Sequence, residues 1–164
     1  MFDKFGEMSS YKEINTLAEN LFNENDIKSL KEMANENGIP KDFVKLYLSG
    51  EIVELCDAEV AALGKIDVEV AELKLKGIME DWTEYIRVQI SENDLLAHRV
   101  RMKGKSLKGC IAALLKWSFT NQVQIDKEIL KMAGVNFGRV TLGIPDMGKA
   151  KEIIRNYYLG GARR

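Results

Sequence analysis

The chain has 164 residues, of which 46% are hydrophobic and 30% are charged, and its formal net charge is −1. A chain of this length and apolar content can bury a sizeable core, which excludes global disorder. No apolar run approaches the ~20 residues that span a bilayer, and the first ten residues mix charge with polarity where a signal peptide needs an apolar stretch. We therefore expect a cytoplasmic protein with no membrane partner.

The near-neutral charge hides an asymmetry between the two halves of the chain. Residues 1–81 hold 9 Lys/Arg and 18 Asp/Glu, whereas residues 82–164 hold 15 Lys/Arg and 7 Asp/Glu. Either the two halves face different surroundings or they neutralise each other where they pack.

The first third of the chain predicts three amphipathic helices. Apolar residues recur at helical spacing in three segments, which are 10–23, 26–37 and 40–50. Asp26 can cap the second helix, Gly38 suits the left-handed residue at its end, and Pro40 suits the first turn of the third. The last two helices outline a helix-turn-helix, but an ordinary helical hairpin is favoured because the third helix offers only Lys41 and Lys45 as cations.

The middle of the chain predicts two longer helices. One covers 51–63 and ends at Gly64, and the other covers 67–90 and is the longest of the chain. Gly77 falls inside the longer helix, where it costs roughly 1 kcal/mol relative to alanine and indicates a kink or a close helix contact. We expect 67–90 to be the central packing helix, and a homodimer through it is one alternative for the quaternary structure.

The rest of the chain completes the predicted fold. Ser91 and Asp94 resemble a capping box, and Ser106 can cap the helix that follows Gly104. Three further segments are predicted, namely a short helix over 125–134 that buries Ile129 and Met132, a short extended piece over 139–142 and a last helix over 145–159. The result is an all-α fold of eight or nine helices.

We expect one helical domain over residues 1–164. The alternative is a pair of lobes, in which 11–64 forms acidic helical hairpins and 67–160 forms the long central helix with a basic helical lobe. At this length both arrangements are compatible with a shared core.

Residues 99–119 join a basic turn to the most apolar helix of the chain. The stretch contains no acid and six cations, which are Arg99, Arg101, Lys103, Lys105, Lys108 and Lys116. Lys108 and Lys116 share one polar face because they lie eight residues apart on a helix. Such a cluster is typical of surfaces that bind phosphate backbones or acidic proteins. The alternative is a solvated face that pairs with the acidic half.

Gly104, Lys105 and Ser106 invite comparison with a phosphate-binding loop. That motif needs a glycine where Arg99 stands and a strand before the loop, whereas the residues before Gly104 are predicted to be helical. This excludes a nucleotide-binding loop of that type. The backbone N–H groups at the start of the next helix, flanked by Lys105 and Lys108, still predict a weaker anion site.

The first half carries a candidate acidic face, whose residues are Glu51, Glu54, Asp57, Glu59, Glu69 and Glu72. These carboxylates form no acid–base site with a histidine that the sequence supports, since His98 is the only histidine. Cys56 and Cys110 read as buried thiols of a cytoplasmic chain, and they lack the clustered partners of a zinc site. We therefore expect no enzyme activity, no metal and no cofactor.

Two segments of the second half carry a resemblance to a known family. The string GKSLKGC at 104–110 opens a helix, and GIPD at 143–146 followed by KAKEIIRNYYLGG at 149–161 closes the chain. This order, over about residues 99–160, resembles the PcfK-like proteins that conjugative plasmids, integrative elements and phages of Gram-positive bacteria encode. Relatives of that group include anti-CRISPR proteins that inhibit the effector nuclease of type II systems.

The resemblance implies a cytoplasmic mobile-element protein that binds a CRISPR effector nuclease or its nucleic-acid complex. The leading hypothesis is thus a non-enzymatic inhibitor that blocks nucleic-acid engagement, with the acidic face as a mimic of backbone charge. The alternative is a helical accessory or regulatory protein that binds DNA or RNA through residues 99–116.

Overall fold

The computed structural model describes residues 2–136 and 138–160. Within these ranges, nine helices and one two-stranded sheet form the regular structure, which confirms the all-α fold. The first three helices lie close to their predicted positions and are α1 Tyr11–Asn23, α2 Ile27–Glu36 and α3 Lys41–Ser49. Local signals account for this agreement: Asp26 accepts a hydrogen bond from the Ser29 N–H at 3.0 Å, and Gly38 has a φ of 73°.

The predicted helices over 51–63 and 67–90 are wrong. The helices found there are α4 Ala58–Leu73 and α5 Ile78–Glu92. α4 begins late because Asp57 caps it, accepting a hydrogen bond from the Val60 N–H at 2.8 Å. The helix then passes through Gly64, where a Cβ would lie only 2.7 Å from main-chain oxygens of the α2–α3 turn. Gly64 is therefore a point of close backbone approach and not a helix end.

A turn separates α4 from α5 where a continuous helix was predicted. Lys74 has a φ of 48°, in the left-handed region, and Gly77 has a φ of 60°. The Gly77 N–H donates to the side chain of Glu80 at 3.1 Å, so this glycine starts α5 and does not kink a longer helix. A homodimer through one long helix over 67–90 loses its basis.

Two helices joined by a short turn follow α5. They are α6 Asp94–Arg101 and α7 Leu107–Thr120. The predicted cap of α7 is confirmed, since Ser106 Oγ accepts a hydrogen bond from the Gly109 N–H at 3.0 Å. The predicted capping box is wrong, because Ser91 lies in the last turn of α5 and Asn93 caps α6 by accepting from the Leu96 N–H at 3.1 Å.

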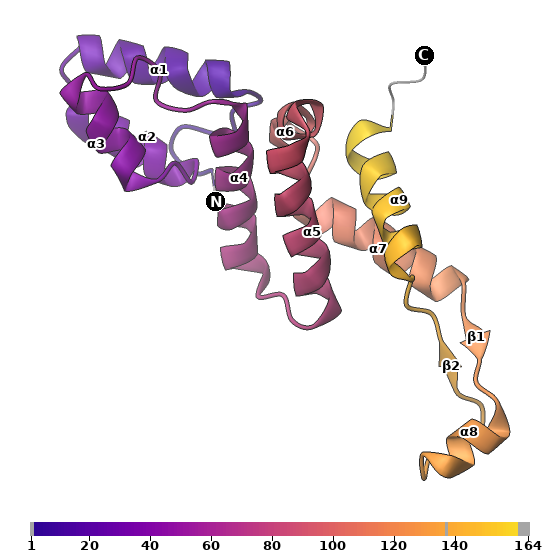
Figure 1. Ribbon diagram of the computed structural model, residues 1–164. Helices are drawn as coiled ribbons and strands as arrows, with labels where there is room; N and C mark the ends of the chain where they lie inside the picture. The colour runs from indigo at the N-terminus through magenta and orange to yellow at the C-terminus, as the bar shows by residue number, and fades with distance from the viewer. Residues whose placement is uncertain (1, 137, 161–164) are drawn as a thin grey trace.

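The buried apolar side chains form two clusters that meet at α4. One cluster joins α1, α2 and α3 and includes Ile14 and Leu30, and the other joins α5, α6, α7 and α9 and includes Trp82 and Leu114. α4 contributes alanines to both clusters, and Tyr11 packs against both. In Figure 1, α4 accordingly lies between the first three helices and α5 with α6.

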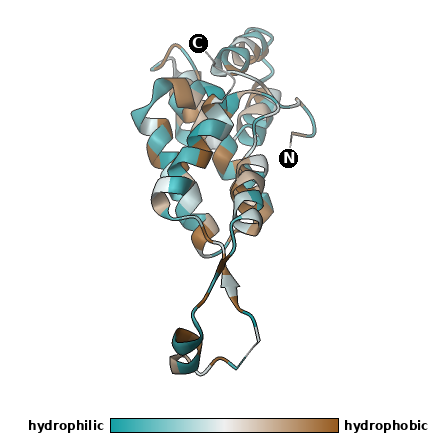
Figure 2. Ribbon diagram, turned by 90° about the vertical axis from the view of Figure 1, so that its right-hand side faces the viewer, coloured by the Kyte–Doolittle hydropathy of each residue, from teal (hydrophilic) through white to brown (hydrophobic). Residues whose placement is uncertain are grey.

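The last part of the chain forms an arm that projects from the helical body (Figures 1 and 2). Its elements are β1 Val123–Gln124, α8 Lys127–Met132 and β2 Thr141–Leu142, after which α9 Met147–Leu159 returns to pack against α7. The strands are antiparallel, so the predicted extended piece over 139–142 is found at its end. Ile129 and Met132 were predicted to be buried, which is wrong: they are 62% and 89% exposed, and α8 buries none of its residues.

Candidate functional site

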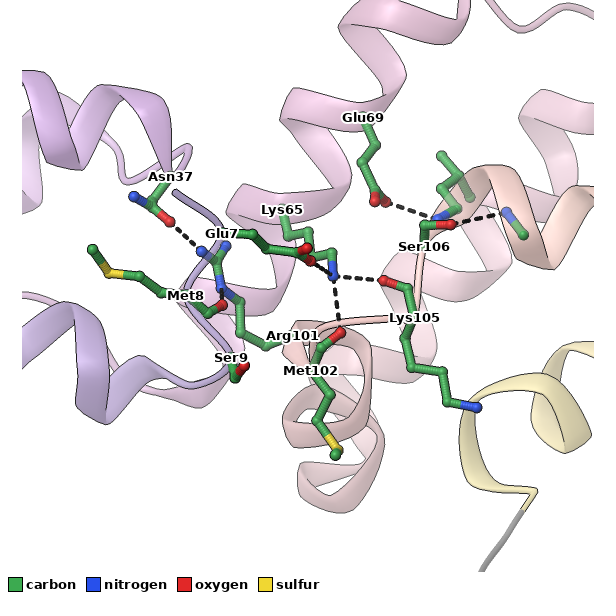
Figure 3. A network of polar contacts seen from close by, with 12 residues as sticks. Glu7, Met8, Ser9, Asn37, Lys65, Glu69, Arg101, Met102, Lys105 and Ser106 are labelled. Carbon is green, nitrogen blue, oxygen red and sulfur yellow. Dashed lines mark hydrogen bonds and ion pairs between the residues drawn. The ribbon is translucent and has the colours of Figure 1, made fainter. Parts of the chain in front are cut away.

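Residues 102–106, here called the elbow, turn the chain from α6 into α7. Lys65 of α4, whose side chain is 1% exposed, contacts the elbow from the side of α4 (Figure 3). Its Nζ donates to the main-chain oxygens of Met102 at 3.1 Å and Lys105 at 2.6 Å, and pairs with the Glu7 carboxylate at 2.5 Å. A buried ammonium with three oxygen partners satisfies all its donors, so the elbow has a fixed path over α4.

Arg101 was predicted to be part of the basic contact surface, and the structure contradicts this. The side chain is 1% exposed. It donates from Nε to the Met8 oxygen at 2.9 Å and from Nη2 to Asn37 Oδ1, as Figure 3 shows, and from Nη1 to the Ala61 oxygen at 3.3 Å. The guanidinium fork thus ties the N-terminal segment, α2 and α4 to the end of α6. Arg101 acts as an internal cross-link and does not reach a partner.

Glu69 was predicted to lie on the acidic face, and it is buried as well, at 4% exposure. Its carboxylate accepts a hydrogen bond from the Leu107 N–H at 2.8 Å, at the start of α7. Burial raises the pKa of Glu69, while the bond from Leu107 and the charge of Lys65 act in the opposite direction. The carboxylate fills the place at this helix terminus where the sequence predicted a site for an external anion.

Tyr157 of α9 closes the other side of the elbow. Its hydroxyl accepts a hydrogen bond from the Ser106 N–H at 3.0 Å, and its main-chain oxygen accepts one from Lys105 Nζ at 2.5 Å. The Lys105 ammonium also lies 5.0 Å from the centre of the Tyr157 ring. A Cβ on Gly109 would lie 2.2 Å from the tyrosine hydroxyl, so this contact requires the glycine. Lys105 is half-buried and engaged inside the molecule.

Four of the predicted cations remain, Arg99, Lys103, Lys108 and Lys116, and we refer to them together as the basic surface. The three lysines are exposed and Arg99 is half-buried. Lys108 and Lys116 lie on one exposed face of α7, as predicted, with Ala112 between them. Two apolar side chains continue this region toward the arm, Leu115 at 39% exposure and Phe119 at 77%. The elbow contacts hold the main chain between Lys103 and Lys108 at residues 105, 106 and 107.

Five of the six residues of the predicted acidic face are exposed. They are Glu51, Glu54, Asp57, Glu59 and Glu72. The first four fall within nine residues, in the loop before α4 and its first turn, and no basic residue lies between positions 46 and 64. Asp57 also caps α4, so its carboxylate has a structural role. This segment is a local concentration of negative charge.

The described residues contain no group of three His, Cys, Asp or Glu side chains that could hold a metal ion. His98 lies 3.5 Å from Asp94 and contacts the ring of Tyr11. Cys56 and Cys110 are free and buried, and burial raises the pKa of each thiol to about 12.

Sequence reasoning missed the internal roles of Lys65, Asn37 and Tyr157. The one available signal was Lys65 itself, a lone cation within the apolar run AALGKIDV.

Comparisons of the chain with protein-family models, with curated proteins and with solved structures gave no match. No helix in the described part of the chain is long and apolar enough to cross a membrane. The function is therefore inferred from the geometry of the site.

Proposed function

We propose that this protein is a non-enzymatic, cytoplasmic binding protein whose basic surface contacts the phosphates of DNA or RNA. The observation that carries the proposal is the pair of exposed lysines on one face of α7, Lys108 and Lys116, with exposed Lys103 in the elbow that leads into this helix. No acid lies between Arg99 and Phe119 in the sequence. Cations grouped in this way attract phosphate backbones and release their counterions on binding.

The internal contacts of the elbow support this function. Lys65, Glu69 and Tyr157 bind the main chain of residues 102–107, so the elbow does not have to be ordered when a partner binds. A preorganised surface loses less conformational entropy on association than a flexible loop does. These internal contacts therefore support the exposed cations indirectly, by holding the main chain of the elbow.

A triple substitution of exposed lysines tests the proposal. Lys103→Gln, Lys108→Gln and Lys116→Gln are combined, and binding to short double-stranded DNA, single-stranded DNA and RNA is measured by fluorescence anisotropy. The association constant for duplex DNA should fall about tenfold for each lysine removed at ~0.1 M salt. The reason is that each phosphate contact multiplies this constant by the salt concentration raised to the power of about −0.9. Lys105 is left intact because it bonds to α9.

The matched control carries the same change of charge elsewhere on the molecule. Lys12, Lys28 and Lys76 are exposed and lie outside the basic surface. Replacing these three with glutamine should leave affinity within about threefold of the wild type, because they contribute no phosphate contact in the proposed mode of binding. Equal losses in both triple variants would show only a net-charge effect and would refute a defined site.

A second candidate function is inhibition of a type II CRISPR effector nuclease. Two observations favour it: the resemblance to PcfK-like proteins, and the exposed carboxylates of Glu51, Glu54 and Glu59. Effectors of this type hold nucleic acid in a positively charged channel that recognises backbone charge, so a clustered acidic segment can compete for it. In this mode the partner is the effector or its nucleic-acid complex, and the basic surface is not needed.

Cleavage assays with several type II effectors separate the two functions. An inhibitor of this kind loses potency when Glu51, Glu54 and Glu59 are changed together to glutamine, with Asp57 kept because it caps α4. The control changes Glu24, Glu84 and Glu92, which are exposed and outside the segment. Unchanged target binding and cleavage by every effector in the presence of the wild-type protein would remove this candidate.

A further inference from the structure

One side of α7 faces the solvent and carries two kinds of side chain. At 3.6 residues per turn, five exposed residues of the helix fall within an arc of about 100°. They are Lys108, Ala112, Leu115, Lys116 and Phe119, and we call this set the α7 face. The buried residues of the helix, such as Cys110 and Leu114, lie on the opposite side. The α7 face therefore combines cations with apolar groups on a helix that leads toward the arm (Figure 1).

Phe119 is the most exposed aromatic residue in the described part of the chain, at 77%. Its ring contacts no other ring and no cation among the described residues. The fold thus places this ring in water without using it for packing. A single exposed apolar side chain is ordinary on a protein surface. What distinguishes Phe119 is its position relative to the two lysines.

The neighbours of Phe119 on the helix are a cation and an apolar side chain. Lys116 precedes it by three residues and Leu115 by four, and residues at these spacings have Cβ atoms about 5–6 Å apart. Around the helix axis, Phe119 falls between Lys108 and Lys116, about 20° from the first and 60° from the second. Neither lysine side chain has a hydrogen-bond or ion-pair partner among the described residues. The α7 face therefore presents a free ring flanked by two free cations.

We propose that the α7 face selects single-stranded DNA or RNA over duplex, with Phe119 as a platform on which a base stacks and with Lys108 and Lys116 as contacts to phosphates. This inference rests on the proposed function and names its substrate class. Lysines alone bind the backbone of either form. A ring can be used only by a base whose flat face is free. Single strands offer such bases, whereas a duplex must first unstack and unpair one.

The α7 face carries little that could read a base sequence. Apart from its lysines, the 14 residues of α7 include none of the Arg, Asn, Gln, Asp or Glu side chains that bond to base edges. Stacking on a phenyl ring tolerates any sequence, because every base has a flat face. We therefore expect similar affinities for single strands of different sequence.

The first test compares three fluorescent probes by anisotropy on the full chain at ~0.1 M salt. The probes are oligo(dT), oligo(rU) and a DNA duplex, each of about 20 nucleotides or base pairs, which exceeds the ~4–16 nucleotides of a typical single-strand site. The wild type should bind both single strands about tenfold more tightly than the duplex. Phe119→Ala should reduce the affinity for the single strands about tenfold and leave the affinity for the duplex within about twofold.

Two further substitutions separate stacking from general apolar contact. Phe119→Trp keeps an aromatic ring and should bind the single strands at least as tightly as the wild type, whereas Phe119→Leu keeps apolar bulk and should lose as much affinity as Phe119→Ala. Circular dichroism should be unchanged in all three, since the ring is 77% exposed. The control is Val53→Ala, which trims a side chain that is 93% exposed elsewhere and should not affect binding. Wild-type affinity in Phe119→Leu would overturn the stacking role.

Two other readouts check the assignment. The salt dependence of single-strand affinity should have the same slope in Phe119→Ala as in the wild type, because the substitution removes no charge. The fluorescence of Phe119→Trp should be quenched by oligo(dT) but not by the duplex, with the wild type, which contains Trp82 and Trp117, as the baseline.

The outcomes distinguish this inference from the proposed function. A duplex bound as tightly as the single strands, or a Phe119→Ala variant with unchanged single-strand affinity, would overturn the role of the α7 face and leave phosphate binding by the lysines intact. If the wild type bound none of the three probes, both proposals would fall.

Discussion

Replacing Arg101 with methionine removes the guanidinium while keeping an unbranched side chain, and it tests whether this residue supports the fold or binds a ligand. The change leaves two buried acceptors without this donor, the Met8 oxygen and the Asn37 side chain, and it removes a second donor from the Ala61 oxygen, which also accepts within α4. Hydrogen bonds to a charged group contribute about 1.5–3 kcal/mol each, and they are not additive. Breaking one side of a buried charged network costs about 3–5 kcal/mol.

Urea unfolding monitored by tryptophan fluorescence measures this loss, because Trp82 is buried in the core. With a slope of about 2 kcal/mol per molar urea, the midpoint should fall by about 2 M. Arg99→Met is the matched control. This arginine lies on the same helix, and its guanidinium has one weak contact, 3.6 Å to the Met102 sulfur. Its free energy of unfolding should change by no more than about 0.5 kcal/mol.

The two variants should also differ in nucleic-acid binding. Arg99→Met removes one cation of the basic surface and should reduce affinity, whereas folded Arg101→Met should bind nearly as the wild type does. The reasoning is refuted if the free energy of unfolding of Arg101→Met lies within about 1 kcal/mol of the wild-type value while the variant loses nucleic-acid binding. Arg101 would then be a contact residue and not a cross-link.

Three other perturbations follow from the same structure. Because burial raises the pKa of Glu69 above its ordinary 4.5, the folded state holds this proton more tightly, and the associated stability is lost as pH rises through the folded pKa. Glu69→Gln should therefore be at least as stable as the wild type at pH 7 in thermal melts, while Glu69→Ala should lose about 1–3 kcal/mol by leaving the Leu107 N–H unpaired. Gly64→Ala should destabilise by about 1–3 kcal/mol in urea titrations through overpacking, although alanine normally strengthens a helix interior; a stabilised variant would contradict the close backbone contact. Cys56 and Cys110, whose pKa values are raised to about 12, should resist a thiol reagent at pH 8 until urea unfolds the chain, and fast labelling of native protein would show that they are accessible.

Helices with strong local signals could be predicted from the sequence. Asp26 and Ser106 were predicted as caps, and each accepts the expected capping hydrogen bond. The middle of the chain could not be predicted in this way. A glycine within a helical pattern of apolar residues can mark either the end of the helix or a close contact with another segment. Gly64 marks a close contact, because the main chain of the α2–α3 turn lies against it. The turn at Lys74 has no glycine or proline at the left-handed position to announce it.

The candidate site was predictable only in part, for a similar reason. The pattern of cations placed Lys108 and Lys116 on one exposed face correctly, because that depends on helix geometry alone. The burial of Arg101 and Glu69 depends on partners that are distant in sequence, since Arg101 bonds to Met8 across 93 positions and Glu69 to Leu107 across 38. Charged residues are almost never fully buried unless paired, so the surface was the reasonable prediction for both.

The salt dependence of nucleic-acid affinity tests the central claim most directly. With Arg99, Lys103, Lys108 and Lys116 as the contacts, a plot of the logarithm of the association constant against the logarithm of salt concentration should have a slope of about −3 to −4 on duplex DNA. The triple lysine variant should reduce the magnitude of that slope by about 3, and the control triple variant should leave it unchanged. A wild-type slope near zero, or one that the basic-surface variant does not alter, would contradict the account.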